Sequence, residues 1–185
     1  MSFEAKSEEQ PLTPEQDAQL RQIVVDRAPA ELAAVDAAAT DEDLFYALPN
    51  AAYAAFHLEQ FDLARNLAQR ALDMAPGYPR NWNHGNAIHA GHTVLGLLAL
   101  RDGDVVAAAE ELKKSGETPG SPQLGSFGPS MHLAKELLKL GQFEPVREYF
   151  RQCRKFWKMG DTWLDLWNKK IDAGEVPNFF MHRYP

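Results

Sequence analysis

Internal repetition constrains the fold of this chain more than any other feature of its sequence. Three segments align with one another: Leu48–Pro76, His92–Gly116 and Met131–Cys153. Small or aliphatic residues recur at two matching places in the segments: Ala52, Gly96 and Ala134 at the first, and Ala64, Ala108 and Val146 at the second. Between these places, the residues at the expected turn are Glu59, Gly103 and Gly141. Repeated helical units bury their apolar faces by stacking on their neighbours. The alignment therefore predicts a stack of about three helix pairs.

The stretch before the first repeat also carries helix signals. Thr13 precedes Pro14 and Gln16, so the threonine is expected to cap a helix, with Pro14 at its first position and Gln16 reaching back to the cap. Thr40 and Asp43 repeat the cap signal. No stretch shows the period-two alternation and β-branched enrichment of a strand. The predicted fold class is therefore all-α.

Two prolines fall inside the expected helical regions. Pro29 is expected to break or restart the helix that begins after Thr13, because proline lacks the N–H group that an interior helical position uses. Pro49 lies within "DLFYALPNAAYAAFHLEQ", where it either kinks a helix or starts a new one.

An amphipathic segment after the third repeat is suited to close the stack. Asp161 or Thr162 is expected to cap a helix over residues 161–173, whose apolar stripe comprises Trp163, Leu166, Trp167 and Ile171. A terminal repeat needs its apolar face covered, so we interpret the tryptophans as core packing, with an exposed ligand-binding cage as the alternative. The chain then divides into a flexible N-terminus (1–12), one helical-repeat domain (13–175, with repeats near 46–76, 90–116 and 129–157) and a tail (176–185).

Length and charge narrow the classes of function. A chain of 185 residues with 45% hydrophobic residues is expected to form one domain with its own core. Its net charge of -7 argues against nucleic-acid binding, which needs positive surface. The apolar runs, such as Val94–Leu100, fall far short of the roughly 20 residues that span a bilayer. With one cysteine and no signal-peptide pattern in its first residues, the chain is expected to be cytoplasmic and not bound to a membrane.

The repeated segments resemble the tetratricopeptide repeat family over residues 46–157. The resemblance rests on Leu95-Gly96, Gly103, Ala108 and Leu112 in the second segment, on Ala64, Ala71-Leu72 and Pro76 in the first, and on Leu133-Ala134, Gly141 and Phe150 in the third. The chain departs from the family by lacking its early tryptophan, by placing Glu59 where the turn takes glycine, and by having longer linkers than the usual repeat of about 34 residues. Over Asn81–Met131 it is similar to repeat-like proteins of bacteria. The resemblance implies an α-α superhelix of about three hairpins with flanking N-terminal helices and a C-terminal capping helix.

The same resemblance implies a binding groove lined by the first helix of each hairpin. Carried over residue by residue, the groove positions are Tyr53, His57, Thr93, Leu97, Arg101, Met131, Lys135 and Lys139. His57, Arg101 and Lys139 occupy the same repeat position and form a column of cations that suits a carboxylate or an acidic peptide. The alternative is that Arg101 and Lys139 are last-turn cations favoured by the helix dipole.

The stretch "NWNHGNAIHAGH" is unusually rich in asparagine and histidine for the start of a helix. His92 shares an apolar stripe with Ile88, Leu95 and Ala99, so we interpret it as a hydrogen-bonded core histidine, with His89 one turn earlier. Asn83 or Asn86 is expected to cap the helix. In the alternative reading the two enlarged loops, 81–92 and 117–131, meet in a ligand site formed by Asn83, His84, Asn86, His89, His92, Ser126 and Phe127.

No pattern in the sequence indicates catalysis, a metal or a cofactor. The three histidines lack the HExxH pairing and have no carboxylate between Arg80 and Arg101, so no metal site is predicted. Cys153 is expected to be buried and inert, since no base accompanies it. The loop "GETPGSPQLGSFGP" lacks the lysine of a phosphate-binding loop.

We therefore predict a scaffold that binds another protein or an acidic peptide without chemistry of its own. The alternative function, from a different class, is a small-ligand-binding protein or enzyme with its site in the two enlarged loops. Self-association through the exposed end of the stack is a third hypothesis.

Overall fold

The computed structural model describes residues 12–184, and every regular element within that range is a helix. The all-α class predicted from the sequence is therefore confirmed for these residues. In chain order the elements are α2 (Pro14–Asp36), α3 (Asp41–His57), α4 (Phe61–Met74), the 3-10 helix η1 (Ala75–Gly77), α5 (His84–Arg101), α6 (Val105–Gly116), α7 (Pro122–Phe127), α8 (His132–Lys139), α9 (Phe143–Phe156), α10 (Asp161–Asp172) and the 3-10 helix η2 (Phe180–His182). The N-terminal segment expected to be flexible, 1–12, falls outside the described residues except for Leu12.

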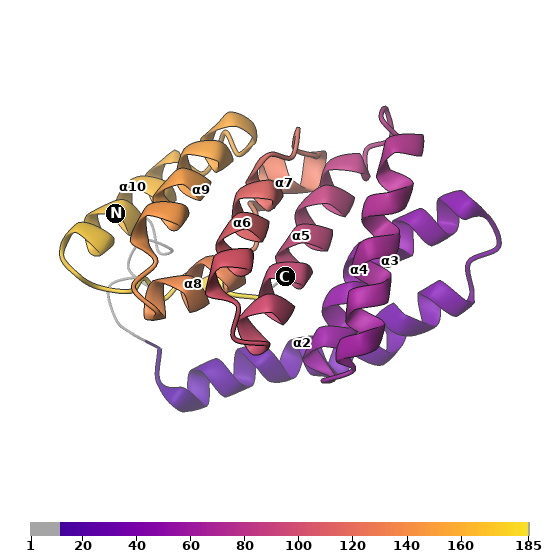
Figure 1. Cartoon of the computed structure of the whole chain (residues 1–185), viewed down its shortest axis with the longest axis horizontal. Coiled ribbons are helices and arrows are strands. Elements are labelled where there is room, and N and C mark those ends of the chain that lie inside the picture. Colours follow the sequence, from indigo (N-terminus) through magenta and orange to yellow (C-terminus); the bar gives the residue numbers. More distant parts are fainter. Residues whose placement is uncertain (1–11, 185) are drawn as a thin grey trace.

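Helices that follow one another in the chain pack against each other. α3 packs on α4, α5 on α6 and α8 on α9, which gives three helical hairpins. The hairpins are joined because α5 also contacts α3, α4 and α8, and because α6 contacts α9. α2 packs on α3 at one end of this stack and extends along its side, whereas α10 packs on α9 at the other end (Figure 1).

The turns inside the three hairpins share one backbone geometry. Glu59, Gly103 and Gly141 have positive φ values of 60°, 84° and 75°. In each turn the next amide donates a hydrogen bond to a carbonyl in the last turn of the preceding helix: Gln60 to Ala55, Asp104 to Ala99 and Gln142 to Leu137. This is the Schellman closure of a helix by a left-handed residue. The predicted equivalence of the three turn positions is confirmed by this geometry.

Glu59 is the strained member of the three turns, because a residue with a Cβ atom is disfavoured at positive φ. We expect Glu59→Gly to raise the free energy of unfolding by about 0.5–1 kcal/mol. The substitution also removes the exposed ion pair between Glu59 and Arg21, 3.6 Å apart, which contributes little to the free energy of unfolding. Gly141→Ala, where an added Cβ meets open space, should lower stability by about 1 kcal/mol through backbone strain alone. Urea denaturation measures both, and an unchanged or lower stability of Glu59→Gly would contradict this account of the turn.

The helix starts predicted at Thr13 and Thr40 are confirmed, because both residues form complete capping boxes with Gln16 and Asp43. The prediction that Pro29 breaks or restarts a helix is wrong, since α2 continues through it. α3 likewise continues through Pro49 without a new start. An interior proline costs a helix about 3 kcal/mol. Packing of α2 against α3, in which Ala28 is buried, offsets that cost.

α10 closes the stack with a tryptophan-rich face. Leu164 and Trp167 are fully buried in the same core as Phe150 of α9, in agreement with the core-packing interpretation of the tryptophans. The N-cap is Gly160 instead of the predicted Asp161 or Thr162. A Cβ atom at residue 160 would collide with the indole ring of Trp157, so this close approach requires glycine.

None of the helices between residues 12 and 184 is long and apolar enough to cross a membrane.

Candidate functional site

Most of the positions predicted to line an open groove are covered. Together with Arg101 and Lys139, these positions form what we call the groove face, the side of the stack made by α3, α5 and α8. The exposed fraction is 5% or less for Tyr53, His57, Thr93, Leu97, Met131 and Lys135. In this structure most of the predicted groove positions are therefore covered by other parts of the chain, and a binding role of these residues stays a prediction.

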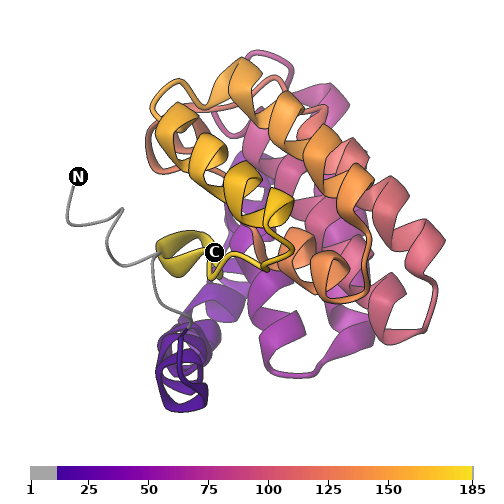
Figure 2. The same cartoon turned by 90° about the vertical axis from the view of Figure 1, so that its left-hand side faces the viewer.

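The C-terminal segment Pro177–Tyr184, which we call the strap, is one of the two elements that cover the groove face (Figure 2). The backbone N–H of Met131 donates to the carbonyl oxygen of His182 at 2.6 Å. The ring of Tyr184 lies edge-on to the rings of His57 and His132, with centroids 5.6 Å and 5.0 Å away. The strap therefore occupies the place where a partner peptide was expected.

α2 is the second covering element, and it is linked to the strap through Asp17. The hydroxyl of Tyr184 donates to the Asp17 carboxylate at 2.9 Å, and the Arg183 guanidinium forms an ion pair with the same carboxylate. Lys135 of the groove face lies beneath, with its ammonium 6.0 Å from the centre of the Tyr184 ring. Burial lowers the pKa of Lys135 to about 8.

Arg101 and Lys139 remain exposed and line one hollow of about 440 Å³, as the shared repeat position predicts. Arg101 lies 4.0 Å from the centroid of the Phe61 ring and pairs with Asp102 at 2.8 Å. Lys139 pairs with Glu136 at 2.8 Å. Both cations are already compensated within the chain, so the hollow offers no unpaired positive charge to a carboxylate.

The three histidines of "NWNHGNAIHAGH" do not converge. His84 donates from Nδ1 to the carbonyl oxygen of Ala75 at 3.0 Å, and His92 donates to Glu111 of α6 at 2.7 Å. His92 is only half-buried, whereas the exposed fraction of His89 is 4%. His92 is hydrogen-bonded, as predicted, but it is not fully buried. The core histidine of α5 is His89, because α5 is packed between several helices and its buried surface is wider than one stripe.

His89 joins three parts of the structure through its ring. Nδ1 donates to the carbonyl oxygen of Ser115 at the end of α6, 3.3 Å away, and Nε2 accepts from the backbone N–H of Ser130 at 3.1 Å. These two bonds fix the neutral tautomer with its proton on Nδ1. Burial lowers the pKa of His89 to about 4. His89 is thus a neutral structural residue that positions Ser130.

A pocket of about 310 Å³ lies beside His89, between α3, α5 and α7. We call it the amide pocket because several of its lining residues carry side-chain amides. The lining residues are Tyr46, Pro49, Asn50, Tyr53, Trp82, Asn83, Asn86, His89, Ala90, Gln123, Leu124, Gly128 and Ser130. Asn83, Asn86 and His89 are therefore brought together with the second enlarged loop, as the alternative ligand-site hypothesis expects. His84 and His92 lie elsewhere.

The two enlarged loops are tied to each other at this pocket. Thr118 donates to the carbonyl oxygen of Gly85 at 2.8 Å, and the Ser121 hydroxyl donates to Oδ1 of Asn86. A Cβ atom at residue 85 would collide with the carbonyl of Gly120, so the loops touch backbone to backbone there. The prediction that Ser126 and Phe127 of the second loop line this site is wrong. α7 turns both toward solvent, and Phe127 is 77% exposed.

The amide side chains form a connected polar wall. Asn83, one of the two predicted candidates, is the N-cap residue of α5, but its side chain makes no capping hydrogen bond. Nδ2 of Asn83 donates to the carbonyl oxygen of Phe45 at 2.8 Å instead, so this side chain ties α5 to α3. Oδ1 of Asn83 accepts from Asn86 at 3.0 Å, and Asn86 also approaches Oε1 of Gln123 at 3.4 Å. Each of these amides is held in a fixed orientation, which is a requirement for selective hydrogen bonding to a ligand.

Aromatic rings form another part of the lining. Tyr46 and Trp82 are stacked with centroids 5.2 Å apart and planes 18° apart, and Trp82 remains 47% exposed. The Tyr46 hydroxyl donates to Glu42 at 2.6 Å and accepts from Asn81 at 3.0 Å, which fixes its ring. The outer face of the Trp82 indole is thus a rigid apolar surface at the pocket.

Some polar atoms of the pocket make no hydrogen bond with the described part of the chain. They are Oδ1 of Asn50, Nε2 of Gln123, Nε1 of Trp82 and the buried hydroxyl of Tyr53. Burial raises the pKa of Tyr53 to about 12, against the opposing effect of the nearby Thr93 and Ser130 hydroxyls. A buried hydroxyl without a partner costs about 1–3 kcal/mol, which a bound polar group could recover.

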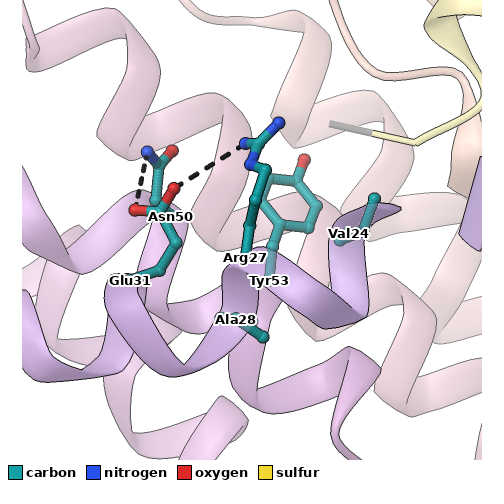
Figure 3. Close-up of a pocket in the computed structure, with 7 residues that line it drawn as sticks. Val24, Arg27, Ala28, Glu31, Asn50 and Tyr53 are labelled. Atoms are coloured by element: carbon teal, nitrogen blue, oxygen red, sulfur yellow. Dashed lines mark hydrogen bonds and ion pairs between the residues drawn. The ribbon is translucent and has the colours of Figure 1, made fainter. Parts of the chain in front are cut away.

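The α3 wall of the amide pocket is shared with a narrow crevice under α2 (Figure 3). Asn50 and Tyr53 line both spaces. Nδ2 of Asn50 donates to Glu31 at 3.2 Å, and Glu31 lies 3.7 Å from Arg27. The charges nearest to this wall are therefore paired with each other and leave the pocket without net charge.

The cysteine and the metal-ligating types of side chain bear on whether the part of the chain that the structure describes offers a nucleophile or a metal site. Cys153 is buried, and burial raises the pKa of its thiol, which disfavours the nucleophilic thiolate. Among residues 12–184, no three His, Cys, Asp or Glu side chains gather closely enough to hold a metal ion.

The sequence interpretation did not assign Tyr46 or Trp82 to this site, and it assigned Tyr53 to the groove. Tyr46, Asn50 and Tyr53 recur at helical spacing on one face of α3, which is the signal that could have placed them together. Trp82 lies between two asparagines in the stretch singled out for its histidines. Ser130 carries no comparable signal, because only the tertiary bond to His89 brings it to the pocket.

No protein-family model matches the sequence, and no curated protein or solved structure matches it either.

Proposed function

We propose that this protein binds a small uncharged ring compound in the amide pocket. The observation that carries the proposal is the lining: its thirteen residues include four side-chain amides and three aromatic side chains but no aspartate, glutamate, lysine or arginine. A charged ligand would lose its hydration there without gaining a partner of opposite charge. A volume of about 310 Å³ lies at the lower end of ligand-binding pockets, which suits a ligand of one or two rings.

In the proposed complex one face of the ring lies against the exposed face of Trp82. Oδ1 of Asn50 accepts from the ligand, and Nε2 of Gln123 donates to it. His89 does not contact the ligand as an acid or base, since both of its ring nitrogens are already bonded. Sugars and nucleosides share this chemistry of a flat apolar face edged with neutral hydrogen-bonding groups.

A thermal-shift screen with matched charged and uncharged compounds tests the proposal. The probes are nucleosides with their 5′-monophosphates, and methyl glycosides with the corresponding uronic acids. We expect an uncharged member of at least one pair to raise the melting temperature and its charged counterpart to have no effect.

Trp82→Ala should weaken binding of that compound about tenfold, the equivalent of about 1.4 kcal/mol. Phe127→Ala, an exposed aromatic of α7 outside the lining, is the matched control and should bind normally. Preference for the charged members, or equal loss in both variants, would contradict the proposal.

A scaffold that binds a protein or peptide is the second candidate function. One observation favours it: the groove face already holds a peptide-like segment, the strap. The three hairpins with a shared left-handed turn position support their description as tetratricopeptide-like repeats. The single unpaired cysteine supports a cytoplasmic location, and a bacterial origin rests on the sequence resemblance alone.

A further inference from the structure

We infer that the strap is a releasable intramolecular ligand of the groove face, and that protonation of the histidines it buries drives its release. These histidines are His57 and His132 beneath the strap and His182 within it. The groove face shares Tyr53 with the amide pocket, but the inference does not rest on the function proposed for that pocket.

The strap can leave without unwinding the helix before it. The end of α10 is closed by its own backbone, because Gly174 donates to the carbonyl of Ile171 and Glu175 to that of Lys170. Residues 173–176 are exposed. The strap is therefore attached to the body of the protein through a short exposed connection. Its other contacts are with the groove face, with Asp17 of α2, and with the aromatic core of α9 and α10, in which the fully buried Phe179 packs on Phe150 and Trp167.

Two histidines lie stacked under the strap with unsatisfied ring nitrogens. The rings of His57 and His132 have centroids 5.6 Å apart and planes 9° apart, and Tyr184 packs on both. Nε2 of His57 and Nδ1 of His132 are buried without a hydrogen-bond partner. A proton added to either nitrogen would have no acceptor while the strap is in place, so the docked state requires neutral rings.

The charges around the two rings oppose protonation as well. Arg21 of α2 acts on His57, and His132 faces Lys135, Lys139 and Arg183. The neighbouring acids are each engaged with a cation: Asp17 of α2 with Arg183, Glu59 of the first turn with Arg21, and Glu136 of α8 with Lys139. Burial is the largest cause that lowers the pKa of His57, to about 4, and that of His132, which falls well below its usual value.

His182 adds to the effect from within the strap. Its ring lies among three tryptophans, with centroid distances of 4.7 Å to Trp157, 5.7 Å to Trp163 and 5.5 Å to Trp167. Burial in this apolar setting lowers the pKa of His182 to about 4. The indole rings carry no charge, and no charged group contributes to this shift.

The direction of the pH effect follows from these values. In the released state the rings are exposed and their pKa returns toward about 6.5, so the released state binds more protons between pH 6.5 and 4. At pH 6.0 each histidine should favour release about fourfold, and three together on the order of 50-fold, relative to neutral pH. Mild acid then uncovers the groove face, including the backbone N–H of Met131.

Hydrogen exchange read by mass spectrometry on the full chain tests the inference. Exchange of residues 177–184 is compared at pH 7.5 and 6.0, after correction for the intrinsic pH dependence of the amide rate. Wild type should show an increase in the strap's open population on the order of 50-fold while α5 and α9 stay protected. The variant His57→Gln/His132→Gln, which keeps only His182, should show about a fourfold increase. His92→Gln, a histidine that faces Glu111 and not the strap, is the control and should behave as wild type.

A second variant keeps the test independent of how well the double variant folds. Tyr184→Ala removes the ring that covers both histidines and should open the strap at pH 7.5 with the helices unaffected. Strap exchange that is unchanged between pH 7.5 and 6.0 in wild type would overturn the inference. So would exchange that rises equally in the double variant, or opening of the strap only together with α5 and α9.

Discussion

Lowering the pH from 7.5 to 5.0 should reduce the free energy of unfolding by at least about 6 kcal/mol, the largest effect that we expect of any single change. The cause is the burial of His57, His89 and His182, each with its pKa lowered to about 4. The buried His132, whose pKa falls well below its usual value, acts in the same direction. In the unfolded chain these rings titrate near pH 6.5, so their contribution is complete above that pH and is lost as the pH falls toward 4. Each histidine accounts for about 2 kcal/mol at pH 5.0.

Urea denaturation at pH 7.5, 6.0 and 5.0 measures this effect. Most of the loss should fall between pH 6.5 and 5.0, above the range in which ordinary carboxylates titrate. His89→Gln, which can keep one of the two hydrogen bonds but does not titrate, should flatten the profile by about 2 kcal/mol. A stability that stays constant down to pH 5.0 would show that these rings are not buried as described.

The second large effect is expected for His89→Ala, which should lower the free energy of unfolding by about 3–4 kcal/mol at pH 7.5. The change removes both ring hydrogen bonds and leaves the buried N–H of Ser130 and the carbonyl of Ser115 without their partner. It also leaves a cavity beside the amide pocket.

His84→Ala is the matched control, because His84 is half-buried and makes one bond, to the carbonyl of Ala75. It should cost about 1 kcal/mol. Chemical denaturation of both variants at pH 7.5 gives the comparison. Equal losses in the two variants would mean that His89 does not join α5, α6 and Ser130 as the structure shows.

Local features of the fold could be predicted well from the sequence. The capping boxes at Thr13 and Thr40 depend on contacts three residues apart, and the turn at Glu59 depends on one backbone conformation. The continuation of α2 through Pro29 could not be predicted in this way. The cost of an interior proline is a local effect, whereas the packing of α2 on α3 that offsets it is a tertiary contact.

The covering of the groove face could not be predicted for the same reason. Tyr184 and Arg183 reach Asp17 at the other end of the chain, and nothing in the local sequence marks these residues as partners. A repeat pattern indicates which helical positions face the groove, but it does not indicate whether another part of the chain occupies it. Lys135, predicted to line the groove, is buried on this account.

Only some residues of the candidate site could be predicted from the sequence. Asn83, Asn86 and His89 were singled out because amides and histidines are unusual in such density, and the structure brings all three to the amide pocket. The prediction of Ser126 and Phe127 is wrong because the loop contains a short helix, α7, which places the buried Leu124 and the exposed Gln123 along the pocket instead.

The most direct test of the central claim is an NMR titration that observes the side-chain N–H groups of Trp82, Asn50 and Gln123. The titrant is the uncharged nucleoside or methyl glycoside that gives the largest thermal shift. Binding in the amide pocket should shift these three signals, with the indole signals of Trp157, Trp163 and Trp167 unchanged. If no uncharged ring compound shifts the Trp82 indole, or if the shifts fall on the groove face instead, the proposed function is wrong.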